Sequence, residues 1–165
     1  MRDSSTDSHE YLFAPRRVGA VDRKLGSFRL LHELGSGGMA ALYLATDIDG
    51  RLLAIKRLHR HLAQDASFVA MFHDEAHIAS LLDHPNIAKV LRLERVGEEL
   101  LIVMEYVHGE SLAALLGEFA HQRQRLPFEA ALHLLGQACL GVHAAHEQRS
   151  ADGAPLGIVH RDLSP

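Results

Sequence analysis

The apolar pattern of this 165-residue sequence changes near Gly109, and the change limits what the chain can fold into. Before this point, five short apolar segments are separated by turns rich in Gly and Asp, a pattern typical of β-strands. One stretch, 66–82, instead carries apolar residues at helical spacing. After Gly109 the helical spacing continues through two more stretches. The sequence therefore predicts an α+β fold, in which a five-stranded antiparallel sheet with one helix precedes a helical part.

The predicted boundaries follow from this pattern. We expect strands at 28–34, 41–46, 51–58, 87–95 and 100–107, and helices at 66–82, 110–120 and 128–146. The polar composition of residues 1–27 predicts a disordered tail. Residues 28–107 would form a first lobe, and residues 108–165 a second, incomplete one.

Composition excludes several function classes. The net charge is −4 and there is no long Lys/Arg run, so nothing favours nucleic-acid binding. The single cysteine, Cys139, excludes a disulfide framework, fits a reducing compartment and is expected to be a small buried residue. No apolar stretch approaches the ~20 residues of a membrane span, and no signal peptide is evident, so we expect a cytoplasmic protein. His73 and His77 have helical spacing, but Asp74 stands where the zinc-protease pattern needs Glu, so no metal site is expected.

Glycines cluster between the first two predicted strands, at Gly35, Gly37 and Gly38. Without a Cβ, backbone N–H groups at such positions can approach a bound phosphate closely. A glycine-rich hairpin can equally serve turn geometry alone. The cluster by itself leaves both interpretations open.

Lys56 lies within an apolar predicted strand, on the same face as Ala54. The small Ala54 leaves room for a flat ring, and Lys56 could reach a phosphate beyond it. A buried ammonium needs a partner, and Glu75 on the following helix is a candidate. The alternative is a lysine that extends to solvent from an edge strand and a solvated helix charge.

The stretch "GIVHRDLSP", residues 157–165, places Asp162 on a loop after two apolar residues. A positioned carboxylate can orient a substrate hydroxyl and accept its proton. An Arg–Asp pair that caps a turn is the simpler alternative.

Taken in order, these motifs resemble the N-terminal half of a eukaryotic-type protein kinase, in the form that bacteria use for Ser/Thr phosphorylation. "LGSGGMAALYLA" resembles the glycine-rich loop, "LLAIK" the lysine motif, "LIVMEYVHGESL" the hinge between lobes, and "HRDLSP" the start of the catalytic loop. The resemblance covers residues 28–165. It implies a kinase-like fold with a complete small lobe and a partial helical large lobe.

The resemblance also implies ATP as cofactor, a protein substrate or partner kinase, and a role for each motif residue. Lys56 would hold the α- and β-phosphates and pair with Glu75, and Asp162 would be the catalytic aspartate. The remaining positions would bind the nucleotide: Gly35, Ser36, Gly37, Gly38, Met39 and Ala40 over the phosphates; Leu34, Leu42, Ala54 and Met104 around the adenine; the backbone of Glu105 and Val107 at its edge; and Glu110 near the ribose.

Four departures from the family pattern qualify these expectations. Ala40 replaces the third glycine, Leu42 the usual valine, and Ser164 the usual lysine near the transferred phosphate. The fourth departure is that the sequence stops before the asparagine and the DFG aspartate that would bind Mg²⁺. Because phosphoryl transfer relies on charge neutralisation, the 165 residues alone are expected to be catalytically incompetent.

Several functions remain open at this stage. The chain could be part of an active Ser/Thr kinase, a non-catalytic nucleotide-binding or kinase-docking regulator, or a decayed remnant. A docking role would use the broad apolar face expected on helix 128–146. A small-molecule phosphotransferase of the same fold is disfavoured by the form of "GSGGMA" and "HRDLSP".

Overall fold

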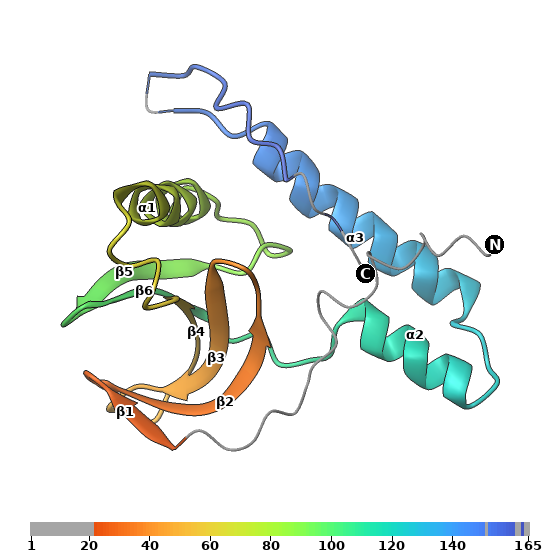
Figure 1. Ribbon diagram of the computed structural model, residues 1–165. Coiled ribbons are helices and arrows are strands. Elements are labelled where there is room, and N and C mark those ends of the chain that lie inside the picture. The colour runs from red at the N-terminus through yellow and green to blue at the C-terminus, as the bar shows by residue number, and fades with distance from the viewer. Residues whose placement is uncertain (1–21, 151, 161–162, 164–165) are drawn as a thin grey trace, which may run out of the picture.

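The computed structural model describes residues 22–150, 152–160 and 163. These residues form a curled antiparallel sheet with one helix across it, followed by two helices beside it (Figure 1). The sheet order is β1-β2-β3-β4-β6-β5. The strands are β1 (Arg23–Leu25), β2 (Phe28–Ser36), β3 (Ala40–Thr46), β4 (Leu52–Leu58), β5 (Val90–Val96) and β6 (Glu99–Glu105). The helices are α1 (Ala66–Ser80), α2 (Leu112–His121) and α3 (Phe128–His146).

The sheet has one strand more than the five predicted, because β1 precedes the first expected strand. The prediction of disorder over 1–27 is therefore wrong for residues 22–27; residues 1–21 lie outside the described part of the chain. Leu25 pairs with Phe28 across a tight turn, and both side chains are buried. Gly26 in this turn has φ +60°, a conformation that favours glycine. The strand was not predicted because the segment is mostly polar and contains only one buried leucine, Leu25.

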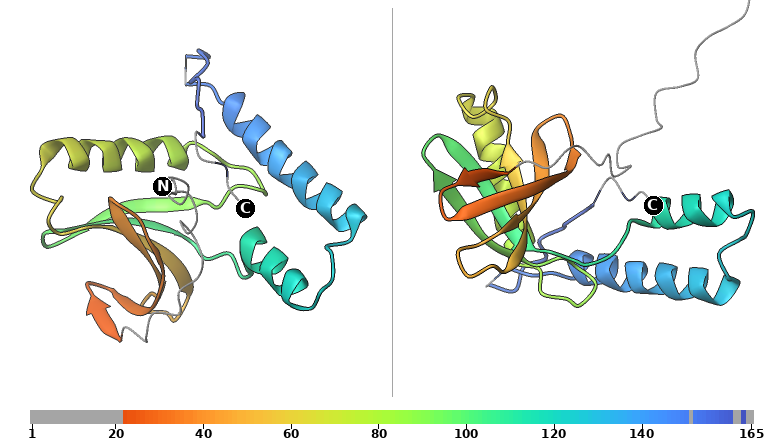
Figure 2. Two further views of the ribbon diagram at one scale, coloured as in Figure 1. Left: turned by 45° about the vertical axis from the view of Figure 1, so that its right-hand side comes forward. Right: turned by 90° about the horizontal axis from the view of Figure 1, so that it is seen from below.

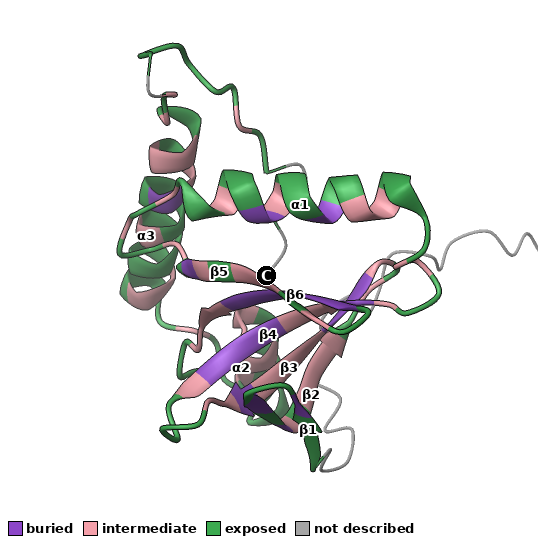
Figure 3. Ribbon diagram, turned by 90° about the vertical axis from the view of Figure 1, so that its left-hand side faces the viewer, coloured by how far each residue is buried: buried purple, intermediate pink, exposed green. Residues whose placement is uncertain are grey.

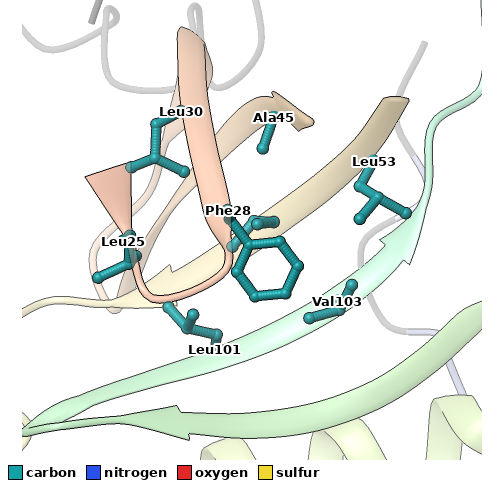
Figure 4. Packing of buried hydrophobic residues seen from close by; sticks show 8 residues of the cluster. Leu25, Phe28, Leu30, Ala45, Leu53, Leu101 and Val103 are labelled. Carbon is teal, nitrogen blue, oxygen red and sulfur yellow. The ribbon is translucent and has the colours of Figure 1, made fainter. Parts of the chain in front are cut away.

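The concave face of the sheet holds the first of two core clusters (Figure 4). Phe28, Leu30 and Val103 are each at most 1% exposed. β2 alternates buried and more exposed residues at its start, whereas the first five residues of β6 are all buried, because β6 is covered on both faces of the sheet. The cluster consists of Leu25, Phe28, Leu30, Ala45, Leu53, Ile55, Leu101 and Val103.

The second cluster lies between the other face of the sheet and α1. Phe72 and Ala76, one helical turn apart, are the buried residues of α1, and both pack against strand residues. Figure 3 shows the buried part of α1 on the side that faces the sheet. Asp65 caps the helix by accepting a hydrogen bond of 2.8 Å from the Ser67 N–H. The strands contribute Ala40, Leu58, Val90, Leu100 and Ile102 to this cluster. The predicted helix is confirmed, and its apolar stripe is what holds it on the sheet.

A buried carboxylate, Glu99, connects β6 to arginines of β4 and the segment after it. Arg57 donates two hydrogen bonds of 2.7 Å to Glu99, and Arg60 donates a third of 2.7 Å. Burial alone would raise the pKa of Glu99, but hydrogen bonds from the two guanidinium groups outweigh burial and lower the pKa below its usual value. Glu99 is therefore held ionised at the sheet end.

The helical part contacts the sheet through the segment between α1 and β5. The Asn86 side chain donates hydrogen bonds to the Gln137 carbonyl (2.8 Å) and to the Gln137 side chain (2.9 Å) on α3. Gly141 lies directly beneath Asn86 and is the one buried residue of α3. Ser111 caps the N-terminus of α2, and its hydroxyl accepts a hydrogen bond from the Ala114 N–H at 3.1 Å.

Most of α3 is exposed, and α2 and α3 lie outside the sheet, with the C-terminal part of α3 near the end of α1 (Figure 2). Cys139 is exposed, so the expectation that it is buried is wrong within the described residues. The reason is that this face of α3 has nothing packed over it there: Leu132, Leu135 and Leu140 are all more than half exposed. Within the described ranges, none of the helices is both long and apolar enough to cross a membrane.

Candidate nucleotide-binding site

The central strands place four of the predicted nucleotide-binding residues on one face of the sheet. In the antiparallel register Leu42 of β3 lies opposite Lys56 of β4, and Ala54 of β4 lies opposite Met104 of β6. Directly opposed residues share a face, and positions two apart in β4 share it as well. Leu42, Ala54, Lys56 and Met104 therefore lie on the face that also carries α1. Ala54 is buried, and Met104 packs against the core beneath α1.

Lys56 and Glu75 form an ion pair between β4 and α1. Glu75 immediately precedes the buried Ala76, so the packing of α1 on the sheet brings its carboxylate to the strand. The two side chains remain 29% and 41% exposed, so the pair is accessible to a ligand. The predicted pairing is present in the structure.

The glycine cluster forms the hairpin between β2 and β3. Gly35 and Ser36 end β2, and the Gly37 N–H closes the turn by donating to the Ala40 carbonyl at 2.9 Å. Neither Gly37 nor Gly38 has a positive φ. A Cβ would meet its nearest atom at 3.8 Å at Gly37 and nothing within 4 Å at Gly38. The packing of the described residues therefore does not require glycine at either position.

The side chains of the other predicted residues in this loop are less accessible to a ligand. Ala40 is buried in the core beneath α1, and Met39 packs against the same cluster. Their side chains thus serve packing, and only their backbone could face a ligand. Leu34 lies at a β-bulge directly before the hairpin, where the pairing of β2 with β3 shifts register.

The predicted hinge follows β6. The Glu105 N–H donates to the Lys89 carbonyl at 3.0 Å, and the Glu105 side chain accepts from the Lys89 N–H at 2.8 Å. Because this N–H is already used, the contribution of Glu105 to an adenine edge is limited to its carbonyl. Val107 is 63% exposed and Glu110 is also exposed, so both are accessible.

The predicted catalytic residue, Asp162, lies outside the described residues. The chain leading to it is described as far as His160, and it lines a cavity of about 340 Å³ between α3 and the segment after α1. Leu82, Val142 and Ile158 form part of the apolar lining of this cavity. The structure thus describes the segment that leads to the predicted catalytic loop, whereas the Asp162 carboxylate lies outside the described residues.

Sequence reasoning missed His59, which follows β4 and contacts the glycine hairpin. Its N–H donates to the Met39 carbonyl at 3.0 Å, and its Nε2 lies 2.8 Å from the Gly37 carbonyl. No motif in the sequence distinguishes this histidine from the twelve others. Its position three residues beyond Lys56 was the only available signal.

Comparisons with known proteins agree with this arrangement. The family model described as "Protein kinase domain" matches residues 28–165. The chain is 40% identical over 144 residues to the tyrosine-protein kinase MasK of Myxococcus xanthus, covering 85% of this chain and 22% of that protein. It is 36% identical over 146 residues to the serine/threonine-protein kinase Pkn1 of Myxococcus xanthus, covering 88% and 19%. It is 38% identical over 141 residues to the serine/threonine-protein kinase PrkC of Bacillus subtilis, covering 85% and 20%.

The chain therefore spans about a fifth of the length of these relatives. Among solved structures, the kinase domain of Mycobacterium tuberculosis PknI superposes with a TM-score of 0.64 at 24% identity, covering 90% of this chain and 57% of that one. This likeness supports the fold. The family match extends from the first residue of β2 to the last residue of the sequence, and the chain belongs to the protein kinase family.

Proposed function

We propose that this chain is the ATP-binding part of a serine/threonine protein kinase, which transfers the terminal phosphoryl group of ATP to a protein hydroxyl. The Lys56–Glu75 ion pair carries the proposal, because it holds an accessible ammonium on the face of the sheet that also presents Ala54 and Met104. A cytoplasmic location and a protein substrate are part of the same proposal.

The residues present fit ATP at both of its ends. Ala54 is small and apolar and has Leu44 and Met104 on neighbouring strands, which suits the flat adenine. At the phosphate end, the missing Cβ atoms of Gly37 and Gly38 leave space that the packing of the described residues does not use. A phosphate is a ligand that would use that space, because backbone N–H groups without a Cβ can approach it closely.

The protein's own groups would act mainly by positioning and by charge. Glu75 orients the Lys56 ammonium, which then binds phosphate oxygens and offsets their negative charge. Asp162, assigned by motif alone, would orient the substrate hydroxyl and accept its proton. Mg²⁺ would supply further charge neutralisation when bound; the described residues contain no cluster of three acidic, His or Cys side chains to hold it.

A second function, nucleotide binding without phosphoryl transfer, is favoured by the exposed apolar face of α3. Leu132 and Leu135 are 53% and 57% exposed, and apolar surface of this kind marks interaction sites. A regulator that binds nucleotide and docks on another kinase would present such a face.

The test is ATP binding measured by isothermal titration calorimetry with and without Mg²⁺, on the wild type and on Lys56→Met. Lys56→Met should weaken ATP binding at least ~10-fold, because it removes a charge-assisted contact to phosphate. Lys89→Met is a matched control, since Lys89 also forms a lysine–carboxylate pair, with Asp83 at 3.0 Å. Equal losses of ATP affinity in Lys56→Met and Lys89→Met would contradict the assignment of Lys56 as the phosphate-binding lysine.

Transfer activity separates the two candidate functions. The assay uses a chain extended through the asparagine and the DFG aspartate of the family pattern, because the 165 residues alone are expected to be catalytically incompetent. In that chain, radiolabelled ATP should label Ser or Thr of a generic protein substrate if the first function holds, and phosphoamino-acid analysis identifies the residue. ATP binding without any labelling supports the second function.

A further inference from the structure

His59 connects the glycine hairpin to the strand that carries Lys56. β4 ends at Leu58, which pairs with Ala40 at the start of β3. His59 extends this pairing by donating its N–H to the Met39 carbonyl at 3.0 Å. Its side chain then reaches across to the Gly37 carbonyl, with an Nε2–O distance of 2.8 Å. A single residue thus contacts the hairpin through both its backbone and its ring.

The direction of the side-chain hydrogen bond follows from the chemistry of its two groups. A carbonyl oxygen only accepts, so Nε2 of His59 must carry the proton. The neutral tautomer with hydrogen on Nε2 and the doubly protonated ring both satisfy this condition. The ring of His61 stacks on that of His59, with centroids 5.6 Å apart, and helps to orient it.

The hairpin has few other constraints at its tip. The Gly37 N–H closes the turn on the Ala40 carbonyl at 2.9 Å, but a Cβ at Gly38 would meet no atom within 4 Å. A glycine-rich turn of this kind loses much conformational entropy when it is ordered. The hydrogen bond from His59 to the Gly37 carbonyl therefore strongly restrains the position of the hairpin tip relative to Lys56.

We propose that His59 is a positioning residue that holds the glycine hairpin at a fixed height over the phosphate-binding position, by donating from Nε2 to the Gly37 carbonyl. We call the hydrogen bond from His59 to the Gly37 carbonyl the anchor, and its existence rests on the structure alone. The ligand that it serves, ATP, rests on the proposed function. In this proposal His59 acts through Gly37 and makes no contact of its own with the nucleotide.

The anchor is tested first without nucleotide, by hydrogen–deuterium exchange of peptides covering residues 34–42. His59→Phe keeps a flat ring but lacks the donor, whereas His59→Gln keeps an N–H donor without the ring. His32→Ala removes an exposed imidazole from β2 and serves as the control. We expect exchange at least ~5-fold faster in His59→Phe, partial protection in His59→Gln, and no change in His32→Ala. Wild-type exchange in His59→Phe would overturn the anchor.

The positioning role is tested by comparing ATP with adenosine in the same variants. His59→Phe should weaken ATP binding about three- to tenfold, the size of one lost hydrogen bond, and leave adenosine binding within twofold of wild type. A general structural defect would weaken both ligands equally, and this result would overturn the positioning role. If wild-type protein binds neither ligand, the proposed function fails and the phosphate role with it, while the exchange experiment still decides the anchor.

Discussion

Lys56 of β4 and Glu75 of α1, 19 residues apart in sequence, meet as an ion pair where α1 crosses the sheet. The packing of Phe72 and Ala76 against the strands sets the height of α1, and hence the position of the carboxylate. A partly exposed pair of this kind contributes little to stability, on the order of 0–1 kcal/mol. Its significance is therefore functional, since it keeps the ammonium directed toward the face that carries Ala54.

The first prediction concerns Glu75→Gln, which preserves size and removes the charge that orients Lys56. ATP affinity should fall ~3- to 10-fold, while the free energy of unfolding changes by less than about 1 kcal/mol. Calorimetry and urea unfolding measure the two quantities. Asp74→Asn makes the same charge change at an adjacent, exposed position and should alter neither. If the two variants bind ATP alike, Glu75 has no specific role.

The second prediction separates ligand binding from folding at the glycine hairpin. Gly37→Ala and Gly38→Ala introduce a methyl group that the described residues accommodate at normal contact distances, with no positive φ to strain. Stability should be unchanged or rise by up to ~1 kcal/mol, because alanine reduces the entropy of the unfolded chain. ATP affinity should nevertheless fall. Loss of stability without loss of affinity would show that these glycines serve the turn.

The third prediction concerns pH and the Glu99 cluster. The folded pKa of Glu99 lies below its ordinary value of 4.5, so its ion pairs stabilise the fold fully above that pH. This stabilisation is lost as pH falls through the lowered pKa. Glu99→Gln should cost about 2–3 kcal/mol at pH 7, because the Arg57 side chain, only 13% exposed, then loses its charged partner.

The same variant provides the measurement of the pH effect. Urea unfolding from pH 7 to pH 3 should show the difference between wild type and Glu99→Gln shrinking below pH 4.5, as the wild-type carboxylate is protonated. Glu98→Gln, at the exposed neighbouring position, should follow the wild-type curve. A difference that is constant with pH would exclude ionisation of Glu99 as its source.

The sequence alone predicted much of this architecture, because both lobes follow strong periodic patterns. The alternation of apolar residues in β3 and β4 and the apolar stripe of α1 made Glu75 a candidate partner of Lys56, and the resemblance to protein kinases then implied the pairing. Strand β1 was not predicted, since three residues with a single buried leucine carry no periodicity. Its pairing depends on the turn at Gly26 and on Phe28, which are tertiary features.

The motifs of the candidate site could be predicted from the sequence, but the tertiary contacts that hold these motifs in place could not. The anchor from His59 to Gly37 depends on where the hairpin ends relative to β4, and one histidine among many gives no signal for that contact. The exposure of Cys139 was missed for a different reason. An apolar helix face predicts burial in general, whereas the described residues place nothing against this part of α3.

The last prediction addresses how the sheet is joined to the helical part. Gly141 on α3 lies so close to the loop after α1 that a Cβ there would be 3.0 Å from the Asn86 carbonyl oxygen. This oxygen belongs to backbone, which the Asn86 side chain ties to Gln137 with hydrogen bonds of 2.8 and 2.9 Å. The loop therefore has little freedom to move aside.

Gly141→Ala should consequently destabilise the chain by about 1–2 kcal/mol, the usual cost of overpacking a closely packed contact. Gly136→Ala is the matched control, because it lies in the same helix and its Cβ would meet nothing within 4 Å. There the higher helix propensity of alanine should stabilise by up to ~1 kcal/mol. Urea unfolding of the two variants therefore gives shifts of opposite sign. Shifts of the same sign would mean that α3 is not held against the Asn86 loop, and that the lobes are joined mainly through the chain between β6 and α2.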